Sequence, residues 1–126
     1  MYGIDECLAE AMGVPGVRGA SLVDWSSGLV LGAVGEGPPG SHEIAAAETT
    51  EVVAAAVRCR SVTTGAAEAM PVEDIIITTS GYHLIRFVDT AFDSNVFLYL
   101  WLDRGDAILA VARFRLKTLA ERLVSV

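Results

Sequence analysis

Hydrophobic residues gather in three closely spaced runs in the second half of the chain, over residues 73–79, 82–88 and 96–102. The runs are rich in β-branched and aromatic residues and short polar segments separate them, which predicts three consecutive antiparallel strands. The third run is apolar at every position from Val96 to Leu102. A strand with one face in water alternates apolar and polar residues, so we expect this strand to be covered on both faces.

The first of these runs, Glu73–Thr79, contains the consecutive isoleucines Ile75, Ile76 and Ile77. It lies at the end of the predicted meander, where a strand has a neighbour on one side only. An apolar edge strand invites pairing with another chain. The pattern therefore favours a partner-binding role.

The first quarter of the chain predicts a short helix and a hairpin. Apolar residues recur on one face of Ile4–Met12, and Gly13 and Pro15 end that helix. Residues 17–25 alternate, residues 26–28 form a turn, and residues 29–34 return as a second strand.

An alanine-rich helix is predicted from His42 to about Thr63, with Ser41 as its N-cap. Small residues let a helix lie close to a sheet or to a second helix, and they leave little room for a cavity. One stripe of this helix contains Thr49, Val52, Val53, Ala56 and either Cys59 or Arg60.

A last helix is predicted after the third strand, with Asp106 as its cap and apolar residues at three- and four-residue steps from Ile108 to Leu123. The predicted order is helix, strand, strand, helix, strand, strand, strand, helix. Its economical packing is α+β: a central five-stranded antiparallel sheet with helices on both faces. No internal repeat or linker interrupts the sequence, so we expect one domain over residues 1–126.

Composition favours an oligomer. Hydrophobic residues make up 52% of the chain and the mean hydropathy is +0.47, both high for a small soluble domain. No stretch reaches the roughly 18 uninterrupted apolar residues of a spanning helix, so direct membrane insertion is not expected. A buried oligomer surface explains the excess better.

The net charge of −7, from 9 basic and 16 acidic residues, argues against binding nucleic acid or an anionic membrane surface. The N-terminus has neither a basic region nor an apolar signal core, so we expect a cytoplasmic protein.

The Gly35-x-Gly37-x-x-Gly40 spacing matches a dinucleotide-binding fingerprint only formally. Pro38 and Pro39 have no amide hydrogen to offer a phosphate, and the preceding strands form a hairpin rather than a βαβ unit. We interpret the segment as a loop. The sequence contains no P-loop and no GxSxG motif.

No catalytic or metal-binding set is apparent, and no cofactor is expected. His42 and His83 lack a spaced cluster of ligands; we expect His42 to be solvated and His83 to be half-buried. Arg86 is unexpected on a central strand, and it either pairs with a carboxylate or lines a dimer surface. The remaining residues have simple structural explanations. We expect Cys7 and Cys59 to be unpaired thiols that are buried or half-buried, and Trp25 and Trp101 to serve packing. Four aspartates fall at strand ends, where turns and caps explain them: Asp89, Asp93, Asp103 and Asp106.

Three segments together resemble the roadblock/LC7 domain, over nearly the whole chain. They are residues 15–24 with Gly28, residues 73–79 with 82–86, and residues 100–104 leading into 107–113. The resemblance implies a profilin-like α-β-β-α-β-β-β-α sandwich and an obligate homodimer. It implies pairing of two third strands across a two-fold axis through Ile75, Ile76, Ile77 and Thr78, with Thr49, Val52, Val53 and Ala56 packed near the axis.

The same resemblance implies a non-catalytic module that regulates or scaffolds a Ras-like small GTPase, in a bacterial system that can include a sensor kinase. Glu48, Glu51, Arg58 and Arg60 on the second helix are candidates for the GTPase-facing surface, and no arginine finger is apparent. The alternative is a PAS-like small-ligand sensor, because PAS-type folds have a similar strand order. That alternative requires a cavity between sheet and helices.

Overall fold

The computed structural model describes residues 2–64, 71–88 and 95–124. Its helices and strands follow the predicted order, with one short helix added. They are α1 Ile4–Ala11, β1 Val17–Asp24, β2 Leu29–Gly35, α2 His42–Arg58, α3 Arg60–Thr63, β3 Glu73–Ile77, β4 Gly81–Val88, β5 Val96–Asp103 and α4 Leu109–Val124.

The strands form one five-stranded antiparallel sheet in the order β2-β1-β5-β4-β3. β5 lies in the middle, and residues 96–100 of this strand are all buried. The prediction that this apolar strand is covered on both faces is therefore confirmed. β3 lies at the edge of the sheet, as its place in the meander predicts.

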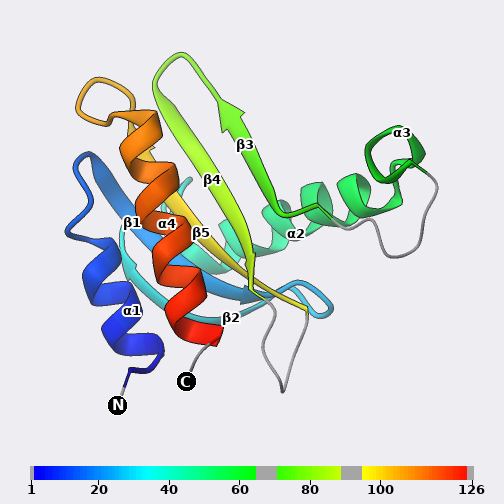
Figure 1. Cartoon of the computed structure of the whole chain (residues 1–126), viewed down its shortest axis with the longest axis horizontal. Coiled ribbons are helices and arrows are strands. Elements are labelled where there is room, and N and C mark those ends of the chain that lie inside the picture. The colour runs from blue at the N-terminus through cyan, green and yellow to red at the C-terminus, as the bar shows by residue number, and fades with distance from the viewer. Residues whose placement is uncertain (1, 65–70, 89–94, 125–126) are drawn as a thin grey trace.

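Helices cover both faces of the sheet, with α1 and α4 on one face and α2 on the other (Figure 1). Along β5 the side chains alternate between two cores: Leu98 and Leu100 point towards α1 and α4, whereas Phe97 and Tyr99 point towards α2. The predicted α+β sandwich is confirmed.

The second helix is shorter than predicted. Ile44 N donates to Ser41 Oγ at 3.3 Å, so Ser41 is the N-cap. The helix ends at Arg58 because Cys59 is extended, with a ψ angle of 110°. The predicted continuation to Thr63 is wrong: residues 58–62 are exposed, so no packing holds them in line with α2. After the break at Cys59, Arg60–Thr63 form the separate short helix α3.

Asp106 is not the cap of α4. The chain makes a hydrogen-bonded turn after β5, in which the amides of Asp106 and Ala107 both donate to Asp103 O. The helix begins three residues after Asp106, at Leu109. Asp103 does serve the turn, because its Oδ1 accepts from Gly105 N at 2.8 Å. Asp89 and Asp93 lie outside the described residues.

Gly19 lets the loop after β2 fold onto the sheet. A Cβ at this position would lie 1.8 Å from Glu36 O, so only glycine fits. Glu36 N donates to Arg18 O at 2.9 Å and fixes the approach. Within the described residues, no helix combines the length and hydropathy that crossing a bilayer requires.

Candidate partner-binding surface

The outer side of β3 carries unpaired backbone groups. Within the described part of the chain, β3 pairs with β4 alone. Two backbone hydrogen bonds show which residues of β3 pair with β4: Phe87 N donates to Val72 O at 3.1 Å, and Thr78 N donates to Gly81 O at 2.9 Å. Hydrogen-bonded and non-hydrogen-bonded pairs alternate along an antiparallel ladder. Even-numbered residues of β3 therefore direct their N–H and C=O groups to β4. The odd-numbered residues, which include Ile75 and Ile77, direct theirs outward.

The side chains of the predicted strand interface lie in three different environments. Ile75 packs against the core under α4, Ile76 is half-buried, and Ile77 is 53% exposed. Thr78 follows the end of the strand. Its hydroxyl accepts from Gly81 N at 2.9 Å, so this side chain stabilises the turn to β4. Three of the four predicted residues thus belong to the edge strand itself.

Asp74 has a buried carboxylate oxygen, Oδ2, with no hydrogen-bond partner. Burial raises the pKa of this carboxyl group above its ordinary value. A buried acceptor without a donor costs free energy.

Glu73 holds the edge strand to its neighbours. Its carboxylate accepts from Arg113 Nε on α4 at 2.8 Å and from Arg86 Nη1 on β4 at 3.1 Å. The hydrogen bond from Arg113, together with the charges of both arginines, lowers the pKa of Glu73. Of the two alternatives for Arg86, the carboxylate pair is the one observed.

α2 extends past the β3 edge of the sheet, and α3 projects beyond it (Figure 1). Three of the four predicted helix residues offer surface on α2: Val52 is 43% exposed, and Thr49 and Ala56 are half-buried. Val53 is 0% exposed and packs inside the protomer in the α2-side core. Its side chain therefore has no surface to offer a second copy, and its place near a dimer axis stays a prediction.

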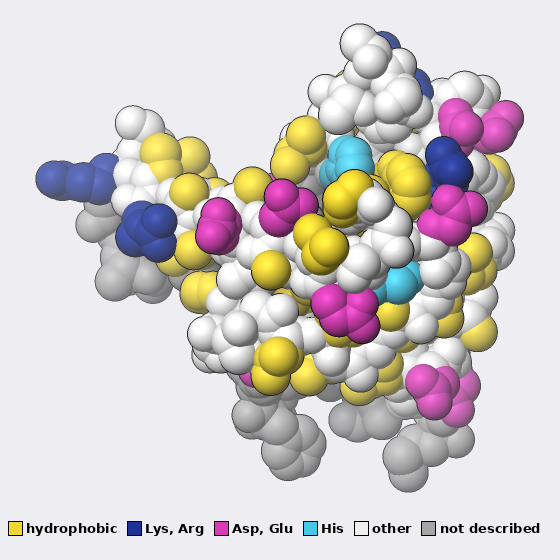
Figure 2. Space-filling model, turned by 180° about the vertical axis from the view of Figure 1, so that it is seen from behind, with side chains coloured by type: hydrophobic (Ala, Val, Ile, Leu, Met, Phe, Trp, Pro, Cys, Tyr) yellow, Lys and Arg dark blue, Asp and Glu magenta, His cyan; other side chains and the backbone are white. Residues whose placement is uncertain are grey.

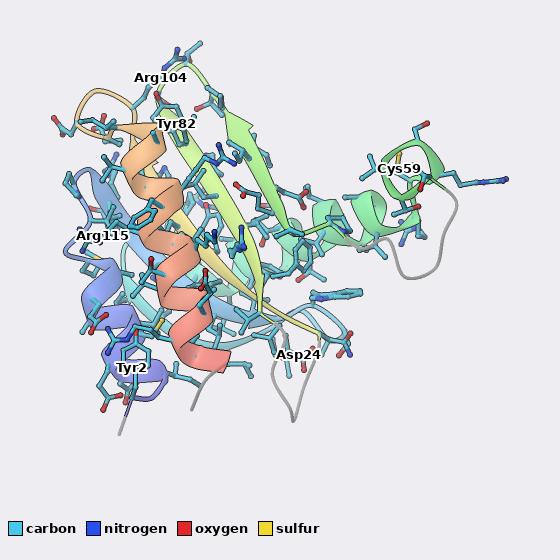
Figure 3. The ribbon with its side chains drawn as sticks, viewed as in Figure 1. Tyr2, Asp24, Cys59, Tyr82, Arg104 and Arg115 are labelled. Carbon is cyan, nitrogen blue, oxygen red and sulfur yellow. The ribbon has the colours of Figure 1, made fainter. Side chains whose placement is uncertain are left out.

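The charged residues predicted to face a GTPase lie along the arm formed by α2 and α3. Glu48 and Glu51 are exposed on α2, and Arg58 and Arg60 are exposed on either side of the junction at Cys59. Figure 2 shows acidic and hydrophobic side chains mixed over α2 and basic ones at the outer tip, and Figure 3 shows Cys59 at that tip, away from the sheet. The structure thus separates an acidic stretch from a basic end rather than forming one cluster.

A stack of aromatic residues lies on the α2 side of the sheet, next to β3, and the sequence did not predict it. The His83 ring stacks between Tyr99 and Trp101, at centroid distances of 6.0 and 6.5 Å. His83 Nδ1 lies 2.7 Å from the Tyr99 hydroxyl. Burial lowers the pKa of His83 and raises that of Tyr99, so it favours the neutral form of both groups. His83 is half-buried, as predicted.

The Gly35–Gly40 loop borders a hollow of about 400 Å³, together with His42 and Trp101. His42 Nε2 lies 2.9 Å from Gly35 O, and its Nδ1 is buried. The expectation that His42 is solvated is therefore wrong: the ring fastens the loop to α2. Elsewhere on this face, Ala46 and Val53 pack against the sheet, where a PAS-like sensor would need a cavity.

Within residues 2–64, 71–88 and 95–124, no group of three or more histidine, cysteine or acidic residues is placed to hold a metal ion. Cys7 is buried, as expected, and burial raises the pKa of its thiol. Cys59 is exposed at the junction of α2 and α3, so the expectation that it is buried or half-buried is wrong.

No protein-family model matches the chain, and no curated protein matches its sequence. Solved structures do match. A roadblock/LC7 domain from Streptomyces avermitilis is 18% identical, with 97% of this chain and 95% of that chain covered and a TM-score of 0.74. The gliding protein MglB from Thermus thermophilus is 21% identical, with 99% and 92% covered and a TM-score of 0.77. MglB from Myxococcus xanthus is 19% identical, with 94% and 80% covered and a TM-score of 0.74. The chain therefore has the fold of the roadblock/LC7 domain proteins.

Proposed function

We propose that this chain, acting as one domain, is a homodimeric module that docks a Ras-like small GTPase in the cytoplasm of a bacterial cell. The observation that carries the dimer is the β3 edge under the overhanging end of α2. Outward backbone groups at Ile75 and Ile77 lie at this edge, and Val52 is exposed on α2. A second copy that pairs β3 with β3 satisfies the backbone and covers the apolar surface together.

The opposite edge of the sheet is the competing site, because β2 also has one side without a strand. Leu29 and Leu31 are 65% and 47% exposed there. At that edge α1 and α2 pack on β2 itself, one on each face of the sheet, and so neither helix overhangs the edge. We therefore assign the dimer to β3.

The GTPase is proposed to dock on the exposed arm formed by α2 and α3. Glu48 and Glu51 supply carboxylates, and Arg58 and Arg60 supply guanidinium groups, all in contact with solvent. Any effect on hydrolysis comes from ordering of the GTPase's own catalytic groups. A sensor kinase is a further proposed member of the same signalling system. The fold shared with roadblock/LC7 and MglB structures supports this assignment.

Light scattering after gel filtration tests the dimer. We expect the chain to elute with twice its monomer mass at micromolar concentration. Ile77→Lys should give a monomer, because a lysine on an edge strand opposes pairing. Leu29→Lys is the matched control on the other edge, and it should leave the dimer intact. A native chain that stays monomeric, or a monomer produced only by Leu29→Lys, contradicts the proposal.

Pull-down with the Ras-like small GTPases of the source organism tests the docking. Binding should occur in at least one nucleotide state, and Glu51→Lys should weaken it by about tenfold, because it reverses a charge in the proposed contact. Asp5→Lys on α1 makes the same charge change on the other face of the sheet and should have little effect. Absence of binding in both the GDP and GTP-analogue states refutes the GTPase assignment.

A further inference from the structure

The solvent-facing side of α4 carries large apolar residues that neither core uses. Ile108, directly before the helix, and Val111 and Phe114 within it follow at three-residue steps and are 64%, 39% and 67% exposed. Residues three apart on a helix are neighbours, so these side chains form one ridge. α4 lies on the sheet face opposite α2 (Figure 1), so the ridge is separate from the proposed GTPase surface.

Two cations flank this α4 ridge without a carboxylate partner. The helix contains four basic residues and one acidic residue: Arg113, Arg115, Lys117, Arg122 and Glu121. Arg113 and Arg122 are engaged by Glu73 and Glu10. In the part of the chain that the structure describes, Arg115 and Lys117 form no ion pair, and both are exposed. Figure 3 shows Arg115 on the side of α4 that faces the connection between α1 and β1.

We propose that the α4 ridge docks an acidic amphipathic helix of another protein. Large apolar side chains of that helix would cover Phe114 and Val111, and its carboxylates would pair with Arg115 and Lys117. An amphipathic helix laid on an apolar surface is a common mode of recognition, and opposite charges at the rim fix its register. Unpaired cations on a chain with a net charge of −7 are a local departure that suits an acidic partner.

Two other occupants fit the ridge less well. A second copy placed ridge to ridge would bring Arg115 and Lys117 of both copies together, and like charges across an interface oppose binding. An anionic membrane attracts a dense cluster of basic residues, whereas this chain is acidic overall.

The test uses two synthetic amphipathic peptides of about 20 residues, one with glutamates and one with lysines on the polar face. Fluorescence anisotropy measures their binding to the full chain. We expect the glutamate peptide to bind, and Phe114→Ser and Arg115→Glu each to raise its Kd by about tenfold or more. Arg18→Glu, the same charge reversal on β1, should leave that Kd unchanged. Raising the salt from about 50 to about 300 mM should weaken binding.

Several outcomes would overturn the inference: no binding of the glutamate peptide, equal binding of both peptides, or equal losses in Arg115→Glu and Arg18→Glu. Light scattering and flotation with anionic phosphatidylserine vesicles address the other occupants. A lower oligomer mass in Phe114→Ser would assign the ridge to a second copy, and loss of vesicle binding in that variant would assign it to a membrane. Because Ile77→Lys tests the dimer separately, this inference and the proposed function can fail independently.

Discussion

Arg113 Nε on α4 donates to Oε1 of Glu73, the first residue of the edge strand, across 2.8 Å. The other carboxylate oxygen of Glu73 accepts from Arg86 on β4 at 3.1 Å. One side chain therefore links β3 to its neighbouring strand and to the helix above it. The strand that is proposed to pair with a second copy is therefore fixed by contacts with β4 and α4, and its outer edge stays free for pairing.

Glu73→Gln should lower Tm by about 2 to 4 °C, because two partly exposed ion pairs are lost together. The pKa of Glu73 is lowered in the folded chain, so its contribution to stability is complete above the ordinary value of 4.5 and is lost as pH falls through the lowered value. Thermal unfolding between about pH 3 and about pH 6 should thus be less pH-dependent in the variant. An unchanged slope would show that the carboxylate is not engaged.

His83 should make the fold less stable in mild acid. Burial lowers its folded pKa below the ordinary value of 6.5, so the unfolded chain takes up the proton first as pH falls. The free energy of unfolding should therefore decrease as pH falls below about 6.5. Urea unfolding between about pH 7.5 and about pH 6 checks this, with His83→Gln as comparison. Parallel pH profiles for the two proteins would rule out His83 as the cause.

Val52 and Val53 are adjacent but should respond in opposite ways. Val53 is 0% exposed, so Val53→Ala should lower the free energy of unfolding by about 2 kcal/mol through the cavity it leaves. Val52 is 43% exposed, so Val52→Ala should cost less than about 0.5 kcal/mol within the protomer. Urea unfolding should be measured in an Ile77→Lys background, because a monomeric protein separates these effects on stability from effects on dimer formation. In the native background, Val52→Ala should weaken the dimer, and sedimentation equilibrium measures that loss.

Gly19→Ala should destabilise the chain by about 2 kcal/mol or more, because the new methyl group would collide with the backbone oxygen of Glu36. The hydrogen bond from Glu36 N to Arg18 O leaves the loop little freedom to retreat. Gly105→Ala is the control: its Cβ would lie 3.3 Å from Asp103 Oδ1, and its cost should stay below about 0.5 kcal/mol. Similar urea midpoints for the two variants would contradict the close approach of loop and strand.

The element order and the two covered faces could be predicted from local patterns, because strand alternation, the apolar run of β5 and the Ser41 cap act over a few residues. Contacts between distant segments could not. The Glu73–Arg113 bond spans 40 positions, and nothing local assigns Arg86 its carboxylate. Helical periodicity placed Val53 in a stripe but could not tell the protomer's own sheet from a partner's surface. The end of α2 at Arg58 could not be predicted, because it depends on where packing against the sheet stops, and no residue type in the sequence indicates that point.

Residue-resolved amide hydrogen exchange on β3 tests the dimer most directly. The amide of Ile76 points to β4 and should be protected at every concentration, whereas those of Ile75 and Ile77 point outward and can be protected only by a second chain. We predict that the amides of Ile75 and Ile77 are strongly protected at high protein concentration. In Ile77→Lys, the amide of Ile75 should lose this protection. Rapid exchange of both outward amides at all concentrations, beside a protected Ile76, would contradict β3 pairing.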